Sequence, residues 1–258
     1  MERAENPPAD PNGKKRMAMQ VIVLLGIVSL FGDITYEGAR SVTGPYLAIM
    51  GANAAVVGFI AGLGEFIGYA LRLASGYLAD KTERYWLMTF LGYGLLVSIP
   101  LLAFAGYWEI AAILLISERM GKAIRAPSRD AILSHATKQV GRGWGFAVHE
   151  ALDQVGAIVG PLLFTAVFIL NGGYREAFSI LWVPVILTIA ILVVAKRKVP
   201  VPERLEATET APIADEHKGK LPKAFWLYTL FILVSVIGFA NFQLISFHLK
   251  AQSVVPDV

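Results

Sequence analysis

The chain has 258 residues, of which 55% are hydrophobic and 17% are charged. Its mean hydropathy of +0.57 is high for a soluble domain and indicates an integral membrane protein in a lipid bilayer. The net charge of +3 is small and lies mostly in the connections between apolar segments, so we expect no nucleic-acid partner. The sequence holds no cysteine, which excludes disulfides and thiol chemistry.

The chain begins with a polar, proline-containing tail at residues 1–16, which ends in Lys14-Lys15-Arg16. The tail has no apolar periodicity, and we expect it to be disordered and cytoplasmic. Residues 17–32 carry no charge, and because no small-residue cleavage site follows, we interpret them as the start of a retained first helix. This helix is expected to reach about Ile49, tilted or broken near Gly44-Pro45.

Further apolar spans follow, and together with the first helix they predict an all-α integral membrane protein with about seven transmembrane helices. They lie at residues 55–79, 86–105, 108–125, 143–169, 174–195 and 224–249. Basic residues gather in the tail and in alternate connections, which puts the N-terminus and the linker 196–223 on the cytoplasmic side. The linker has mixed charge and several prolines, so we expect it to join two units.

The two expected units are unequal in size. Residues 17–195 form a six-helix bundle, whereas residues 224–258 supply one more helix and little else. A single helix cannot bury its own apolar faces, so the sequence is expected to be cut short within its second unit.

Charged residues recur at helical spacing on several of these spans. A charged side chain at the centre of a bilayer costs about 2.5–3.5 kcal/mol on insertion scales, so these faces are expected to point into the protein. We regard them as candidates for a substrate or proton pathway; the alternative is a set of structural ion pairs that fix helix register. The candidates on the first, second and fourth helices are Asp33, Glu37, Arg40, Glu65, Arg72 and Arg119.

The fifth helix carries a further polar stripe. His149 and Asp153 lie on the same face as Gly156 and Gly160, and Pro161 follows. We expect Asp153 to pair with a base from the first, second or fourth helix, and His149 to share or relay a proton or else to be a satisfied core residue. The glycines predict a closely packed helix contact.

No metal-binding His/Glu motif, nucleotide-binding loop or Gly-x-Ser-x-Gly nucleophile elbow occurs in the sequence. We therefore expect a protein that is not an enzyme and that uses neither a metal nor a cofactor.

Three sequence motifs resemble those of the major facilitator superfamily. Gly76-Tyr-Leu-Ala-Asp80-Lys-Thr-Glu-Arg84 resembles the family's loop motif between helices 2 and 3, with a glutamate in place of the motif glycine. Gly156-Ala-Ile-Val-Gly160-Pro161 resembles the helix 5 motif associated with facilitator antiporters. Residues 125–131 and 143–153 are similar to a prokaryotic subgroup whose substrates are mostly unassigned.

The resemblance implies the N-terminal half of a secondary transporter in the plasma (inner) membrane of a prokaryote, monomeric at full length. Such proteins move a small solute by alternating access. It implies proton-coupled export as the leading function, with Gly76, Asp80 and Arg84 as a conformational switch. One alternative is uptake of a small organic solute or anion, with Arg40, Arg72 and Arg119 as anion partners. Another is a truncated membrane protein that does not transport.

Overall fold

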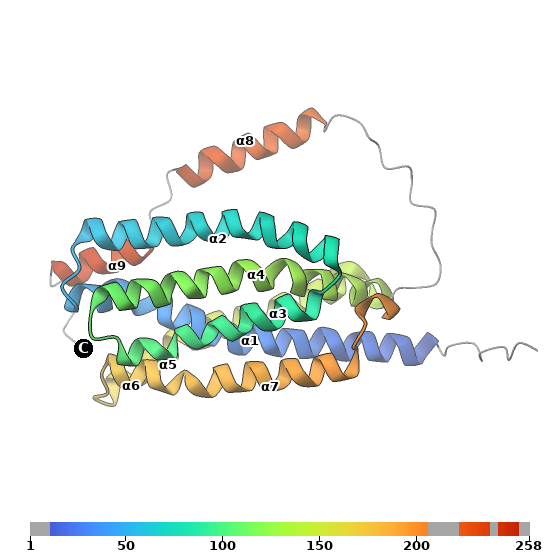
Figure 1. The fold of residues 1–258 in the computed structure, drawn as a ribbon, viewed down its shortest axis with the longest axis horizontal. Helices are drawn as coiled ribbons and strands as arrows, with labels where there is room; N and C mark the ends of the chain where they lie inside the picture. The colour runs from blue at the N-terminus through green and yellow to red at the C-terminus, as the bar shows by residue number, and fades with distance from the viewer. Residues whose placement is uncertain (1–10, 206–221, 238–241, 253–258) are drawn as a thin grey trace, which may run out of the picture.

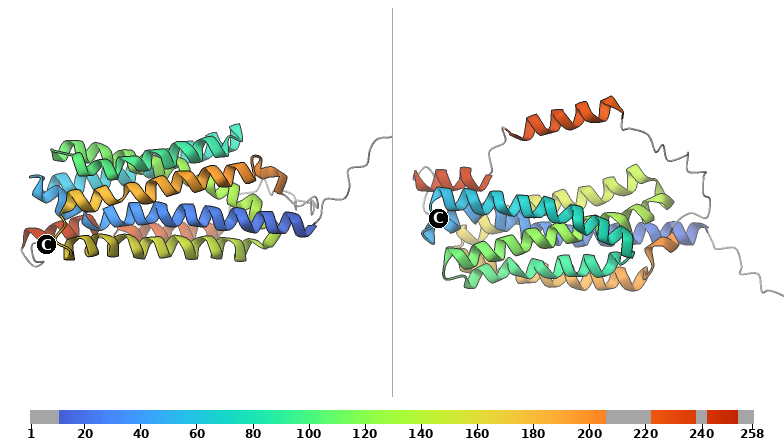
Figure 2. Two further views of the ribbon diagram at one scale, coloured as in Figure 1. Left: turned by 90° about the horizontal axis from the view of Figure 1, so that it is seen from below. Right: turned by 45° about the horizontal axis from the view of Figure 1, so that its top comes forward.

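A computed structural model describes residues 11–205, 222–237 and 242–252, and all regular structure in these ranges is helical. The elements are α1 (Pro11–Ile49), α2 (Ala54–Thr82), α3 (Tyr85–Gly94), η1 (Leu95–Ser98), η2 (Pro100–Phe104), α4 (Trp108–Val140), α5 (Arg142–Ile169), α6 (Tyr174–Ile180), α7 (Trp182–Lys198), η3 (Pro202–Leu205), α8 (Lys223–Ile237) and α9 (Phe242–Ala251). The long helices run side by side in one elongated bundle (Figures 1 and 2). The predicted all-α membrane fold is confirmed.

Within the described residues, five helical stretches are long and apolar enough to cross a membrane. They are Asn12–Ile49, Ala54–Thr82, Tyr85–Phe104, Arg142–Ile169 and Tyr174–Lys198. The helix α4 has 33 residues and packs against α1, α2, α3 and α5. Its charged residues lower its mean hydropathy, yet its length and its place in the bundle are those of a further spanning helix (Figure 1).

The boundaries of the predicted elements need correction at both ends of the chain. Residues 11–16, expected to be disordered, belong to α1, because lysine and arginine are good helix formers and extend the apolar helix. Residues 1–10 lie outside the described residues. The expected seventh helix is two helices: α9 packs against α1 and α2, whereas every described side chain of α8 is exposed and α8 stands apart from the bundle (Figures 1 and 2).

Three interior spans also differ from their predicted form. The fourth helix continues through Pro127 to Val140, beyond its apolar part, because its polar end packs against α5 and η3 rather than facing lipid. The third span changes to 3₁₀ geometry from Leu95, ahead of Pro100, and the sixth is divided at Leu181, shortly before Pro184. Proline lacks the amide hydrogen of a regular helix, which favours a break near these positions. The first helix, in contrast, continues through Pro45 to Ile49.

The helix α1 occupies the centre of the bundle and contacts α4, α5, α7 and α9. Its closest neighbour is α5, and the contact is made by backbone atoms. A Cβ atom at Gly160 would lie 2.6 Å from the carbonyl oxygen of Ile34 and 2.7 Å from the amide nitrogen of Gly38. Gly156 lies in the same way against the backbone of Leu30. The approach of α1 to α5 therefore depends on the missing side chains of these glycines.

This contact predicts a specific loss of stability. Gly160→Ala forces two backbones apart, and overpacking of this kind costs about 1–3 kcal/mol. Gly62→Ala is the matched control, because a Cβ at Gly62 meets no atom within 4 Å. Thermal unfolding of the purified chain should show a melting temperature several degrees lower for Gly160→Ala, at about 2–4 °C per kcal/mol. Equal melting temperatures for the two variants would contradict the packing.

Candidate functional site

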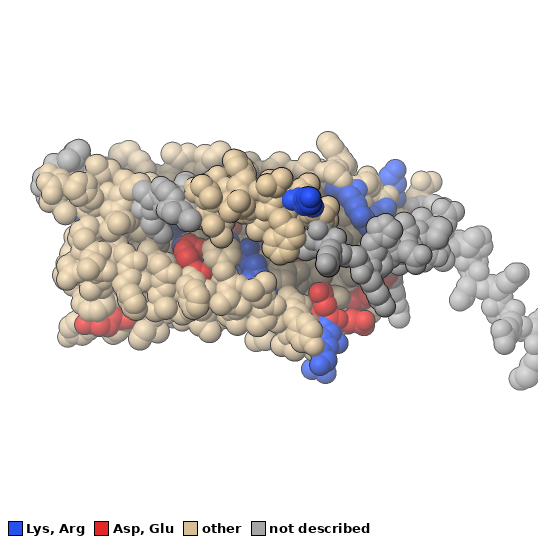
Figure 3. Space-filling model, turned by 90° about the horizontal axis from the view of Figure 1, so that it is seen from above, with Lys and Arg blue, Asp and Glu red and all other residues tan. Residues whose placement is uncertain are grey.

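A cavity of about 320 Å³ lies between α1, α2 and α4. Its lining residues are Tyr36, Arg40, Glu65, Gly68, Tyr69, Arg72, Arg119, Lys122 and Ala123. Four of these side chains are cationic and one is a carboxylate, so the lining is strongly positive. Figure 3 shows charged atoms of both signs in a recess midway along the body, with further charged groups towards its ends. Arg40, Glu65, Arg72 and Arg119, predicted separately from three helices, thus meet at one site.

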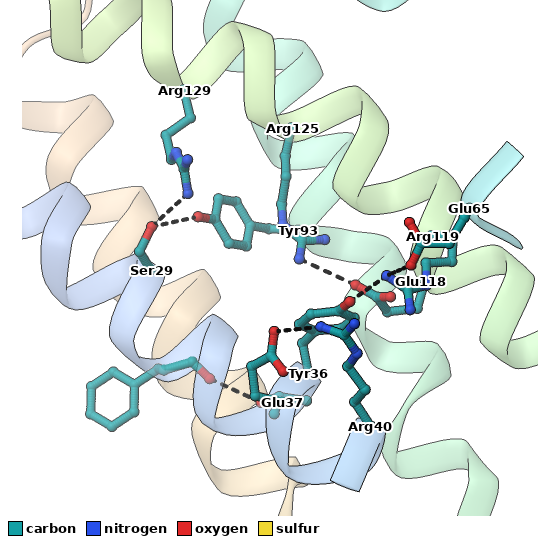
Figure 4. A network of polar contacts seen from close by, with 12 residues as sticks. Ser29, Tyr36, Glu37, Arg40, Glu65, Tyr93, Glu118, Arg119, Arg125 and Arg129 are labelled. Atoms are coloured by element: carbon teal, nitrogen blue, oxygen red, sulfur yellow. Dashed lines mark hydrogen bonds and ion pairs between the residues drawn. The ribbon is translucent and has the colours of Figure 1, made fainter. Parts of the chain in front are cut away.

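Tyr36 on α1 is the residue around which the cations gather. Its side chain is buried, and its hydroxyl accepts a hydrogen bond from Arg119 (Figure 4). The Lys122 ammonium lies 3.8 Å from the centroid of the Tyr36 ring, and the Arg119 guanidinium carbon lies 5.0 Å from it. Cations at these distances are attracted to the electron-rich ring. A single aromatic side chain therefore helps to hold two cations of α4 beside the cavity.

The carboxylates near the cavity neutralise some of these cations. Glu65 pairs with Arg119 at 3.1 Å, which ties α2 to α4, and Glu37 pairs with Arg40 at 3.5 Å within α1 (Figure 4). Arg72 and Lys122 form no ion pair within the described part of the chain. The Arg72 guanidinium lies 5.7 Å from the ring centroid of Tyr69 instead.

A second ion pair lies deeper in the bundle and is closed to solvent. Glu118 and Arg125, both on α4, are separated by 3.2 Å, and their side chains are 2% and 4% exposed. The guanidinium carbon of Arg125 also lies 5.0 Å from the ring centroid of Tyr93 on α3. Its burial and its aromatic neighbour suit a structural pair that ties α4 to α3.

A third polar group centres on Ser29 and joins four helices. The Ser29 hydroxyl accepts a hydrogen bond from Arg129 of α4 at 2.8 Å, and it lies 3.4 Å from the hydroxyl of Tyr93 (Figure 4). It also lies 3.1 Å from Nε2 of His149 on α5. His149 is buried, so this predicted residue is held inside the bundle, away from the cavity lining.

Two acids of the predicted polar stripes, Asp33 and Asp153, have different surroundings. Asp33 is half-buried on α1 and feels the positive charges of Lys122 and Arg125 and the negative charge of Asp153. Asp153 keeps one buried oxygen without a hydrogen-bond partner. The expected pairing of Asp153 with a base stays a prediction: Arg129 of α4 interacts electrostatically with Asp153, but its hydrogen bonds go to Ser29 and Asp130.

The residues of the helix 2–3 loop motif lie at one end of the bundle, away from the cavity. Asp80 and Arg84 are exposed, and neither forms an ion pair among the described residues. Gly76 packs towards Pro127, since a Cβ there would lie 3.6 Å from that ring. Glu83 has a φ of 54°, a left-handed conformation that favours glycine, which explains why the family motif has glycine at this position.

Five lining residues were absent from the predicted site, and two of them, Lys122 and Tyr36, matter most for its chemistry. Lys122 follows Arg119 by three residues on the charged face of α4, so helical spacing could have placed it in the set. Tyr36 gave no such signal, because a search for charged stripes does not register an aromatic ring that binds cations. Its role becomes visible only when α4 is placed against α1.

Comparison with known proteins identifies the family. A family model described as Major Facilitator Superfamily matches residues 20–254. The chain belongs to the major facilitator superfamily. The expected family is therefore confirmed, as is the prediction of a membrane protein with several crossings.

The curated relatives of this major facilitator chain are bacterial and archaeal. An uncharacterized protein of Mycobacterium tuberculosis is 44% identical over 246 residues, which cover 92% of this chain and 59% of the relative. An uncharacterized MFS-type transporter of Methanocaldococcus jannaschii is 34% identical over 247 residues, covering 93% of this chain and 59% of the relative. The chain thus spans about three fifths of the length of these relatives. Their sources fit a prokaryotic plasma membrane.

The buried pair of α4 can be tested by substitution. Glu118→Gln leaves Arg125 buried without a countercharge, and loss of one partner of a buried pair costs about 3–5 kcal/mol. The melting temperature of the purified chain should fall steeply, and the double variant Glu118→Gln/Arg125→Met should recover much of it. Glu109→Gln, at the exposed first turn of α4, is the control and should cost less than about 1 kcal/mol. A Glu118→Gln chain as stable as this control would refute the structural assignment.

Proposed function

We propose that the chain acts within a secondary transporter that moves a small solute across a prokaryotic plasma membrane by alternating access. The observation that carries the proposal is the polar cavity between α1, α2 and α4. Its volume of about 320 Å³ lies in the range of small-molecule sites, about 300–1,000 Å³. A polar recess between three helices of the bundle suits a solute that must leave water and return to it.

The transport is coupled to protons, and Asp33 and Asp153 are the residues that carry them. Asp153 has a buried oxygen without a hydrogen-bond partner, and it interacts electrostatically with Arg129 of α4. Asp33 interacts electrostatically with Lys122 and Arg125 of α4 and with Asp153 of α5. A small movement of α4 or α5 relative to α1 would change which charges Asp33 meets, and this links proton uptake to conformation.

Export is the preferred direction, and its support is the helix 5 motif. Gly156 and Gly160 allow α5 to lie against the backbone of α1, and Pro161 follows within the helix. Because no side chains interlock at this contact, the two helices can shift relative to each other, as alternating access requires. Gly76, Asp80 and Arg84 act at the membrane edge as a switch between conformations, because charges at a helix end are easily paired and released.

The second candidate is uptake of a small anion by a protein of the same architecture. The cationic lining of the cavity favours it, since Arg40, Arg72 and Arg119 all reach the same space. Both candidates have the N-terminus in the cytoplasm and act as a monomer, and they differ only in the direction of net movement.

Neutralising the two acids separates proton coupling from solute movement. Asp33→Asn and Asp153→Asn, each made in the full-length transporter reconstituted in vesicles, should abolish solute accumulation driven by a proton gradient. Each variant should still exchange labelled for unlabelled solute, because exchange needs no net proton movement. Glu150→Gln is the control, since Glu150 is an exposed acid of α5 that bonds to Gln154.

Two results would contradict the assignment. Proton-driven accumulation that survives both single substitutions would return these acids to a structural role. Loss of exchange together with loss of accumulation, at normal protein yield, would show that the acids hold the solute or the fold rather than the proton.

A further inference from the structure

The charges of the cavity are unbalanced, and the imbalance can be assigned to particular residues. Glu65 compensates Arg119, and Glu37 compensates Arg40. Arg72 and Lys122 also line the cavity, and neither pairs with a carboxylate within the described ranges. Their aromatic neighbours, Tyr69 and Tyr36, cover one side of each cation. Aromatic rings supply attraction without removing charge, so the remaining donors stay available to a ligand.

A cationic solute does not suit this space. Glu65 is the acid in the lining, and its carboxylate already contacts Arg119 at 3.1 Å. A cation that entered would meet Arg72 and Lys122, and the described lining holds no further carboxylate to offset the repulsion, since Asp33, which interacts with Lys122, lies outside it. Guanidinium and ammonium groups are instead the partners that carboxylates and phosphates select, through charge-assisted hydrogen bonds.

We propose that the transported solute is a small oxyanion, bearing a carboxylate or a phosphate, and that Arg72 of α2 and Lys122 of α4 bind it over the ring of Tyr36. The inference rests on the proposed transport function and names the substrate class of the same cavity. It also gives Tyr36 a role: the ring holds the Lys122 ammonium 3.8 Å from its centroid, which fixes the cation in place for the anion.

The absence of cysteine from the sequence allows a direct test of the cavity's field. A single cysteine at Gly68→Cys lines the cavity, and its Cβ would lie 4.0 Å from the Arg119 carbonyl oxygen, at ordinary contact distance. The purified 258-residue chain is then labelled with two thiol reagents of equal chemistry and opposite charge. They are the anionic sulfonatoethyl methanethiosulfonate and the cationic trimethylammonioethyl methanethiosulfonate. Gly106→Cys, outside the cavity and with no atom within 4 Å of its Cβ, is the reference position.

The expected result is a preference for the anionic reagent. The ratio of anionic to cationic labelling rates should be about tenfold higher at position 68 than at position 106, as a focused positive field in a cleft produces. Adding Arg72→Gln or Lys122→Gln to the Gly68→Cys chain should lower the ratio towards the reference. Arg175→Gln is the matched control, because this arginine lies beside Phe104 and not in the cavity, and it should leave the ratio unchanged.

Protection by small ions completes the test and identifies the anion. Succinate and citrate represent carboxylates, inorganic phosphate and glycerol 3-phosphate represent phosphates, and choline and glucose are the cationic and neutral controls. At least one anion should slow labelling at position 68 several-fold, and Arg72→Gln should remove that protection. The class that protects, carboxylate or phosphate, is the class of the solute.

The inference is overturned if both reagents label position 68 at the same relative rates as position 106, if choline protects, or if none of the anions does. These outcomes are separate from failure of the transport proposal. An anion-selective cavity in a full-length protein that moves no solute would leave this binding site intact and end the transport proposal. Proton-driven movement of a cation by the full-length protein would support the transport proposal and overturn the assignment of an anionic solute.

Discussion

The organisation of this chain follows from one constraint: charged side chains on a spanning helix must be covered by protein or water rather than lipid. The constraint acts most strongly on α1, whose polar residues run from Ser29 through Asp33 and Glu37 to Arg40. One side of this helix is covered by α5 and another by α4. The helix α5 lies close to α1, because Gly156 and Gly160 have no side chains and let the two backbones touch. The close packing of α5 on α1 therefore also covers part of the polar face of α1.

The polar groups around α1 fall into two sets, one enclosed within the bundle and one beside the cavity. The group at Ser29 draws on Arg129, Tyr93 and His149, and the pair of Glu118 with Arg125 is almost fully buried. Both groups are enclosed within the bundle and fix helix positions, although one guanidinium nitrogen of Arg125 has no hydrogen-bond partner there. Near Tyr36 the balance differs, because cations exceed carboxylates and a cavity adjoins them. The division separates the part of the bundle that holds its shape from the part that can bind a solute.

Much of the fold followed from the sequence, because its signals are local. Apolar runs of spanning length located the helices, and helical spacing placed Asp33, Glu37 and Arg40 on one face of α1 before any neighbour was known. The ends of α4 and the division of the last helix into α8 and α9 were missed. A hydropathy window stops at the first run of charges, whereas α4 continues through Pro127 because its polar end packs on other helices.

The candidate site was harder to anticipate, because it depends on which helices lie side by side. Helical spacing predicted the charged residues of α1, α2 and α4 one helix at a time. It could not predict which of them contact each other. Asp153 was expected to meet a base, and Arg129 of α4 interacts with it electrostatically while its hydrogen bonds go to Ser29 and Asp130. Tyr36 was passed over because its importance lies in its distances to Arg119 and Lys122, which belong to a helix more than eighty positions away in the sequence.

The central claim is that the cavity between α1, α2 and α4 carries a solute through the membrane. Electrical recording from the full-length transporter in vesicles adsorbed to a solid-supported membrane tests it directly. A sudden addition of the protecting anion should produce a transient current, since charge moves within the protein on binding and transport. Arg72→Gln should reduce this current strongly, and Arg175→Gln should not. An unchanged current in Arg72→Gln, or no current with any anion in a correctly folded protein, would contradict the account.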